Sequence, residues 1–142
     1  MNAAPTFRLE PVDGLITIAG AYTPTANIHD PGSTYSRYFV PNTIGPTAFL
    51  AWSQLAAWLP ADDLATYAIN HAEFAYALGT APGRLTKTLG RLLAFHLAYT
   101  IPTEPDTLYV KRRAPTLNPK QLARLAERCP TLAACHDEQF AA

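Results

Sequence analysis

The chain is organised around the stretch from His71 to Arg113, in which local signals specify two successive helices joined by a tight turn. Gly79 is expected to close the first helix, because a left-handed residue after a helix is least strained as glycine. Pro82 is expected to open the second helix, since the N–H that proline lacks has no partner in a first turn. With Asn70 as the N-cap of the first helix, the pattern predicts a helix from His71 and another from near Pro82.

The second half of this stretch has the pattern of two strands. Leu97 to Ile101 is an apolar run, residues 102–106 (PTEPD) form a turn cluster, and Thr107 to Val110 is rich in β-forming residues. The basic tripeptide Lys111-Arg112-Arg113 follows the second strand directly. The predicted order is therefore helix, turn, helix, strand, turn, strand and a basic end.

This order resembles the winged helix-turn-helix DNA-binding proteins of the bacterial transcriptional regulator type. With the helix that precedes it, the resemblance covers roughly residues 37 to 113. The positions that carry it are Phe74, Ala75, Leu78, Gly79, Ala81, Arg84, Lys87, Leu89 and Leu92. Two positions depart from the pattern: Ala81 replaces the usual capping Ser or Thr, and Gly90 lies inside the second helix at a cost of about 1 kcal/mol relative to alanine.

The segments on either side complete a fold expected to be mainly α with a small β-component (α+β). Asp13-Gly14 lies between two β-rich runs and predicts an N-terminal β-hairpin, followed by a loop over residues 20–36. We divide the chain into an N-terminal hairpin and loop extension (1–36), the winged helix-turn-helix domain (37–113) and a C-terminal helix with a tail (114–142). The other expected elements are a short strand at Arg37–Val40, a long helix at Thr43–Leu59, a strand at Thr66–Ile69 and a helix at Asn118–Arg128. On this division, residues 1–36 are expected to be dispensable for the fold.

Charge is distributed unevenly along a chain whose formal net charge is zero. Residues 1–70 carry two basic and five acidic side chains, whereas residues 84–128 carry nine basic and three acidic ones. Such an asymmetry suggests a nucleic-acid partner, although a solvated basic face would give the same counts. No apolar run approaches the ~20 residues of a membrane span and no signal peptide is visible, so we expect a cytoplasmic protein without a membrane partner.

The second helix of the motif carries the expected contact residues. Leu85, Leu89, Leu92 and His96 form one narrow stripe, with Lys87 opposite and Arg84 and Arg91 flanking that outer face. Recognition helices read bases with their first turns, so we expect Arg84 and Lys87 at the bases and Arg91 at a phosphate. Lys111 and Arg112 are expected to anchor the basic end to the DNA backbone. The full predicted DNA-binding set is Arg84, Thr86, Lys87, Arg91, Lys111, Arg112 and Arg113.

Three groups of residues suggest other chemistry, but none makes a complete motif. His71-Ala72-Glu73 is half of the zinc deaminase signature, whose P-C-x-x-C half is missing. Cys129, Cys135 and His136 could hold a metal ion only with a fourth ligand from elsewhere in the chain, and the two cysteines otherwise fit ordinary thiols in a reducing cytoplasm. No phosphate-binding loop, nucleophile elbow or dinucleotide fingerprint is present. The sequence therefore predicts a non-enzymatic protein with no cofactor and no metal.

The leading hypothesis is sequence-specific binding of double-stranded DNA by a transcriptional, plasmid or phage regulator. The alternative is a winged-helix module that binds proteins and not DNA, because a fold does not settle a function. We also expect a homodimer, since pairing doubles the DNA contact and reads two half-sites. Its expected surface is the nearly all-apolar helix at residues 43–59, with Trp52 and Trp58. The sequence identifies no small-molecule effector.

Overall fold

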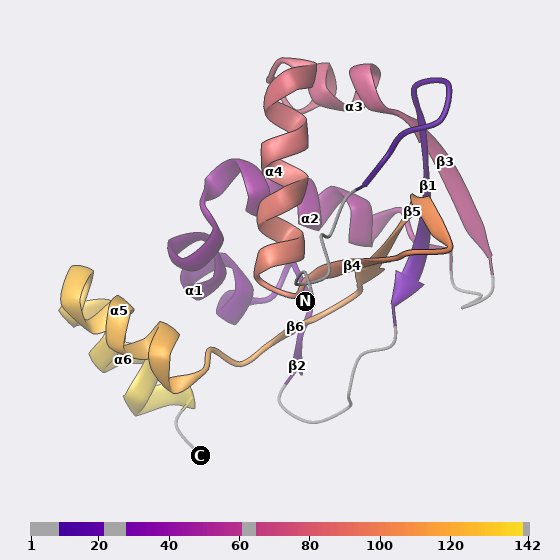
Figure 1. Ribbon diagram of the computed structural model, residues 1–142. Coiled ribbons are helices and arrows are strands. Elements are labelled where there is room, and N and C mark those ends of the chain that lie inside the picture. Colours follow the sequence, from indigo (N-terminus) through magenta and orange to yellow (C-terminus); the bar gives the residue numbers. More distant parts are fainter. Residues whose placement is uncertain (1–8, 22–27, 61–64, 141–142) are drawn as a thin grey trace, which may run out of the picture.

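The structure is a computed structural model that describes residues 9–21, 28–60 and 65–140 of the chain. The fold is α+β, with helices, a small four-stranded mixed sheet and a two-stranded antiparallel pair of β2 and β6 (Figure 1). The helices are α1 (Thr34–Ile44), α2 (Pro46–Ala57), α3 (His71–Ala77), α4 (Pro82–Ala94), α5 (Pro119–Arg128) and α6 (Pro130–Phe140). The strands are β1 (Leu15–Ala21), β2 (Ile28–His29), β3 (Thr66–Asn70), β4 (Ala98–Ile101), β5 (Glu104–Lys111) and β6 (Ala114–Pro115).

The elements of the central motif lie where the sequence predicts them, and their boundaries have the expected local causes. The Asn70 side chain accepts a hydrogen bond from the Glu73 amide at 3.0 Å and so caps α3. Gly79 follows α3 with a φ of 77°, in the left-handed region. Pro82 occupies the first turn of α4. The predicted strands at residues 66–69, 97–101 and 107–110 correspond to β3, β4 and β5.

The sheet has the order β3-β1-β5-β4, so the N-terminal strand lies inside it. β1 pairs antiparallel with β3, Leu15 opposite Asn70, and parallel with β5, Thr17 opposite Thr107. The predicted turn at Asp13-Gly14 is present: both residues have a positive φ, and Val12 and Leu15 exchange backbone hydrogen bonds of 3.0 and 2.9 Å. Among the described residues the hairpin extends no further than this isolated bridge, and Phe7 and Arg8 lie outside them. The central position of β1 is also not what the winged-helix resemblance implied.

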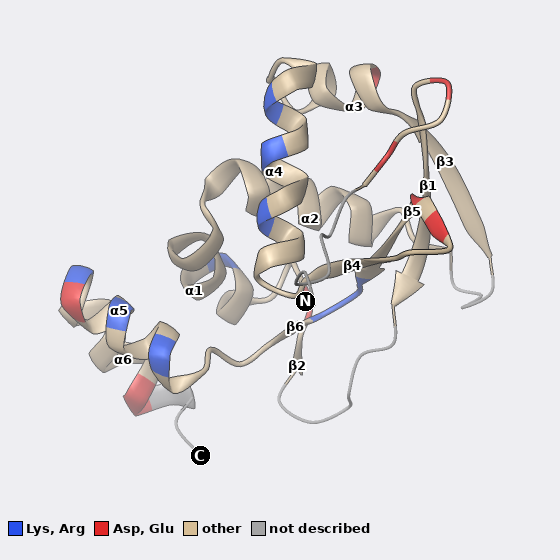
Figure 2. Ribbon diagram, in the orientation of Figure 1, with Lys and Arg blue, Asp and Glu red and all other residues tan. Residues whose placement is uncertain are grey.

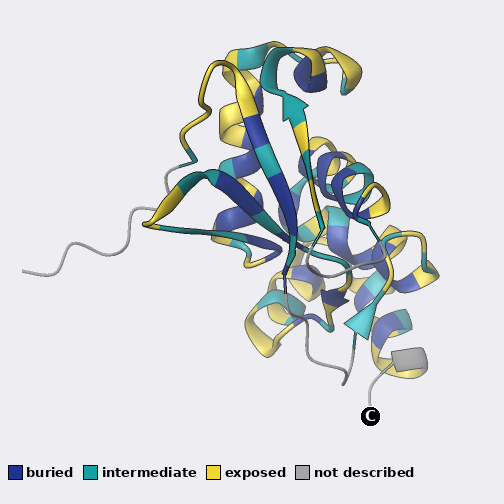
Figure 3. Cartoon of the chain, turned by 90° about the vertical axis from the view of Figure 1, so that its right-hand side faces the viewer, coloured by how far each residue is buried: buried dark blue, intermediate teal, exposed yellow. Residues whose placement is uncertain are grey.

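One face of the sheet packs against α2 and α4 to make the main core. In Figure 1 these helices stand on the same side of the sheet, and Figure 3 shows that buried residues recur along the strands. The strands contribute the fully buried Ile16, Ile18 and Leu108. The helices contribute the fully buried Trp52, Leu55, Leu85, Leu89 and Leu92. The apolar stripe predicted on α4 therefore faces the core, except for His96, which is exposed just beyond the helix.

Of the two predictions about residues 37–59, the strand is wrong and the helix begins later than expected. Arg37–Val40 is not a strand but part of α1, which Ser33 caps by accepting a hydrogen bond from the Ser36 amide. The buried Tyr35 and Phe39 are four residues apart, which is helical spacing, and α1 continues through Pro41. The helix expected at Thr43–Leu59 is present as α2, but it begins only at Pro46, because the backbone turns at Gly45 with a φ of 93° and Thr43 still belongs to α1. The boundary expected between residues 36 and 37 consequently falls inside α1.

A second, smaller core joins α1 to the C-terminal helices. It contains Tyr35, Phe39, Leu117, Leu125 and Ala133. The Tyr35 hydroxyl accepts a hydrogen bond from the Leu117 amide at 2.8 Å and lies 2.7 Å from Nε2 of the buried His136. α5 begins, as the sequence predicts, after Asn118, which forms a capping box with Gln121. α5 also lines a cleft together with Asn42 at the end of α1 and Phe95 at the end of α4, so it lies beside both helix ends.

Candidate nucleic-acid interface

The exposed side of α4 is the first candidate surface. Arg84, Thr86 and Lys87 are exposed, while Leu85 and Leu89 between and after them are buried. The buried Thr88 donates its hydroxyl hydrogen to the Arg84 carbonyl at 3.1 Å. The first half of α4 thus holds three polar side chains toward solvent on a helix that is anchored in the main core.

Two glycines leave the backbone of this side of α4 open. A Cβ atom built at Gly83 or Gly90 meets no atom within 4 Å. Neither glycine has a positive φ, so the backbone conformation does not require glycine at either position. Both residues lie on the same side of α4 as Lys87, at spacings of three and four residues. Another molecule can approach this part of the helix closely.

Arg91 is on α4 but is engaged within the protein. Its Nε donates to the Ile44 carbonyl at 2.6 Å, and its Nη2 lies 3.5 Å from the Thr43 carbonyl. Its guanidinium carbon stands 5.5 Å from the centre of the Phe95 ring. Arg91 therefore satisfies carbonyl groups at the end of α1, where a helix leaves them without partners. This role was not predicted from the sequence.

The basic tripeptide lies at the end of β5 that is far from the β4–β5 turn. The Lys111 amide donates to the Leu97 carbonyl at 2.9 Å, which places Lys111 beside the end of α4. The turn itself is followed by Glu104, which accepts a hydrogen bond from the Tyr109 hydroxyl. The tip of this hairpin is therefore acidic, as the red segment of β5 in Figure 2 shows.

The three side chains of the tripeptide have different surroundings. Burial lowers the pKa of the half-buried Lys111. Arg112 donates a hydrogen bond to the Pro60 carbonyl. Its guanidinium packs closely over Gly20, where an added Cβ atom would lie 3.4 Å from Nη2 of Arg112. Arg113 forms an ion pair with Asp30 at 3.0 Å, with both side chains largely exposed. Arg112 thus has a structural role, whereas the Arg113 ion pair is exposed and can exchange for another partner.

A row of cations on α5 forms a second candidate surface. Lys120, Arg124 and Arg128 are exposed at four-residue intervals, and they line a cleft between α5 and the ends of α1 and α4. Figure 2 shows basic segments along both α4 and α5. In the sequence, the four-residue spacing of these cations predicts that the three side chains lie on one exposed side of a helix. The spacing does not predict that this side lines a cleft.

The other candidates of the sequence do not come together as a metal site. Among residues 9–21, 28–60 and 65–138, no three His, Cys, Asp or Glu side chains are grouped so that they could hold a metal ion. His136 is buried in the second core and bonded to Tyr35. His71 and Glu73 lie in the first turn of α3. Cys129 and Cys135 are free thiols.

Comparison with known proteins adds no relative. No family model, curated protein or solved structure matches this chain. Within the described part of the chain, no helix has the length and apolar character needed to cross a membrane.

Proposed function

We propose that the chain binds double-stranded DNA with the first half of α4. The observation that carries the proposal is the exposed set Arg84, Thr86 and Lys87, held on a helix whose opposite side is buried. Arginine and lysine donate to guanine O6 and N7 in the major groove or to phosphates. The open backbone at Gly83 and Gly90 fits close approach to a groove.

The order of elements supports a winged-helix type of arrangement for this proposal. α2, β3, α3, α4, β4 and β5 follow one another as in the resemblance described above. The additional strand β1 between β3 and β5 is a departure from that pattern. Because Glu104 lies next to the β4–β5 turn, we assign no phosphate contact to the tip of that hairpin.

The proposed set of DNA-contacting residues is consequently smaller than the set predicted from the sequence. The primary DNA contacts remain those predicted on the first half of α4: Arg84, Thr86 and Lys87. Arg91 and Arg112 serve mainly to hold the protein together, as their bonds to Ile44 and Pro60 indicate. Lys111 and Arg113 are secondary phosphate contacts. The proposed role is that of a regulator of transcription, or of a plasmid or phage, acting in the cytoplasm of a bacterium.

A protein-interaction module is the second candidate, and one exposed surface favours it. Trp58 is 49% exposed and lies edge-on to Phe74, with ring centres 5.9 Å apart. Trp58, Phe74 and Ile69 line a shallow hollow of about 280 Å³. Trp52, by contrast, is fully buried and donates to the Lys111 carbonyl at 2.8 Å, so of the two tryptophans only Trp58 remains for a homodimer surface.

Binding to labelled duplexes of random sequence, measured by fluorescence anisotropy, tests the first candidate. We expect the logarithm of the association constant to fall linearly with the logarithm of the salt concentration, with a slope of about −0.9 per phosphate contact. Selection from the random pool is expected to enrich one sequence motif. Binding of this chain to a protein partner, together with no measurable affinity of this chain for any duplex, would instead support the interaction module.

Light scattering tests the homodimer. Trp58→Ser is expected to weaken the dimer relative to the unmodified protein.

A further inference from the structure

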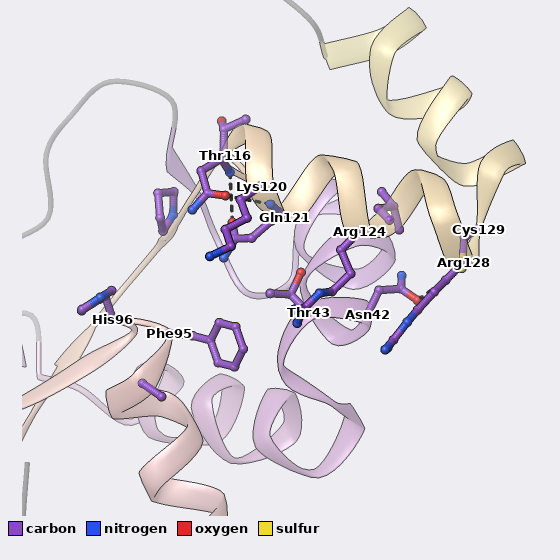
Figure 4. A pocket seen from close by; sticks show the side chains of 14 residues that line it. Asn42, Thr43, Phe95, His96, Thr116, Lys120, Gln121, Arg124, Arg128 and Cys129 are labelled. Carbon is purple, nitrogen blue, oxygen red and sulfur yellow. Dashed lines mark hydrogen bonds between the residues drawn. The ribbon is translucent and has the colours of Figure 1, made fainter.

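A cleft of about 570 Å³ lies at the junction of three helices. Its walls come from the end of α1, the end of α4 and the length of α5 (Figure 4). The residues that matter most here are Asn42, Phe95, Lys120, Gln121, Arg124 and Arg128. The volume is within the range of small-molecule sites, which is roughly 300–1,000 Å³.

The charge of the cleft has one sign. Lys120, Arg124 and Arg128 line it, and no Asp or Glu of the described residues does. In the described part of the chain, these three cations form no ion pair. Like charges four residues apart on one helix repel each other, so each neighbouring pair in the row costs α5 some stability. An anion in the cleft would relieve this repulsion.

The spacing of the cations suggests more than one negative group. The α-helix rises 1.5 Å per residue, so Lys120 and Arg128 are about 12 Å apart along α5. A single carboxylate is too small to meet cations at both ends of that row. A diphosphate or an equivalent pair of anionic groups spans more of it.

The floor of the cleft is apolar and aromatic. Phe95 is half-buried, and Figure 4 shows its ring directed into the space between α4 and α5. Leu125 and Ala94 add apolar surface, while Asn42 and Gln121 bring amide groups. Aromatic side chains stack on planar rings such as nucleobases. A duplex keeps the faces of its bases stacked inside the helix, so it offers no ring face to stack on Phe95.

We propose that this cleft binds a small organic polyanion with a planar ring, of the class of a nucleoside diphosphate. Arg124 and Arg128 bind the anionic groups and Phe95 stacks on the ring. The cleft lies at the far end of α4 from Arg84 and Lys87, so this proposal does not depend on the proposed DNA contact.

Isothermal titration calorimetry with four probes tests the proposal: ADP, AMP, adenosine and tripolyphosphate. We expect ADP to bind most tightly, AMP more weakly, and adenosine and tripolyphosphate each at least about tenfold more weakly than ADP, because each of these last two lacks one half of the recognised chemistry. Equal affinity for ADP and tripolyphosphate would overturn the role of the ring. Absence of ADP binding would overturn the proposal as a whole.

Matched substitutions locate the site. Arg124→Gln and Arg128→Gln should each raise the Kd for ADP by about tenfold. Arg37→Gln removes the same charge from an exposed position outside the cleft and should leave that Kd unchanged. Thermal melts of each variant confirm that it is folded. Equal losses in all three variants would mean nonspecific attraction and contradict the proposal.

Cys129 provides a local readout, because it lines the cleft whereas Cys135 does not. ADP should slow the alkylation of Cys129, measured peptide by peptide, and leave that of Cys135 unchanged. Unchanged alkylation of Cys129 at saturating ADP would place the nucleotide elsewhere. If duplex DNA displaces ADP, and Arg124→Gln weakens both to the same extent, the cleft is part of the DNA surface and the small-molecule site is refuted.

Discussion

Arg91 on α4 donates its Nε hydrogen to the Ile44 carbonyl at the last residue of α1, across 2.6 Å. This bond joins the helix proposed to contact DNA to the helix that supports the C-terminal pair. Removing the guanidinium leaves a helix-terminal carbonyl without its donor and removes the stack on Phe95.

Arg91→Ala is therefore expected to lower the free energy of unfolding by about 1–2 kcal/mol. Arg91→Lys keeps the positive charge but not the fork of donors, and should recover only part of this loss. Urea denaturation of the two variants measures the effect. Full stability in Arg91→Ala would show that the bond to Ile44 contributes nothing.

Gly90→Ala should separate folding from binding. The added methyl group meets no atom within 4 Å, so alanine is expected to stabilise α4 by about 1 kcal/mol. If α4 lies against a DNA groove, the same methyl group should weaken duplex binding. Gly32→Ala is the control, because its Cβ is equally unobstructed but lies outside α4. A more stable variant with unchanged duplex affinity would place the DNA away from Gly90.

β1 should be essential to the fold, contrary to the expectation that residues 1–36 are dispensable. Ile18 is fully buried between β3 and β5, so Ile18→Ala is expected to cost about 2–5 kcal/mol. Leu15 on the same strand is 46% exposed, and Leu15→Ala should cost much less. Chemical denaturation distinguishes these outcomes. Similar small effects from both substitutions would indicate that β1 adds little to the core.

These results separate what the sequence could predict from what it could not. Asn70, Gly79 and Pro82 act on their own neighbours, through a cap, a left-handed residue and a first-turn proline. For this reason the limits of α3 and α4 were predictable. The pairing of Thr17 with Thr107 joins strands far apart in the chain, and no local pattern specifies it.

The errors around α1 have a related cause. Pro41 was expected to stop a strand, but the helix tolerates it because packing of Tyr35 and Phe39 against the second core fixes α1. On the candidate surface, the sequence predicted that Arg84 and Lys87 would be exposed. It could not predict that Arg91 and Arg112 would bond to backbone carbonyls of distant segments.

Acid should destabilise the contact between α1 and the segment after β5. His29 stacks on Tyr35 with ring centres 3.8 Å apart, and its Nε2 lies 2.9 Å from the Thr116 hydroxyl oxygen. Burial, and then the nearby His136, lower the pKa of His29 below its ordinary value of 6.5. The unfolded chain therefore binds a proton at a higher pH than the folded one.

The stability that neutral His29 provides is complete above pH 6.5 and is lost as the pH falls through the lower, folded-state pKa. Thermal melts between neutral and mildly acidic pH should show this fall. His29→Gln should reduce it, while His96→Gln, at an exposed site, should not. An identical pH profile in His29→Gln and the unmodified protein would exclude His29 as the source.

The central claim is that the first half of α4 contacts double-stranded DNA, and the salt dependence of one matched pair of variants tests it most directly. Lys87→Gln and Arg37→Gln each remove one exposed cation, the first from α4 and the second from α1. Lys87→Gln should lower the affinity for duplex DNA. If Lys87 contacts a phosphate, the magnitude of the salt slope should fall by about 0.9, the value for one phosphate contact. If Lys87 contacts a base, the sequence preference at one base pair should be lost. Arg37→Gln should retain both the affinity and the slope. Equal behaviour of the two variants, both folded, would contradict the claim.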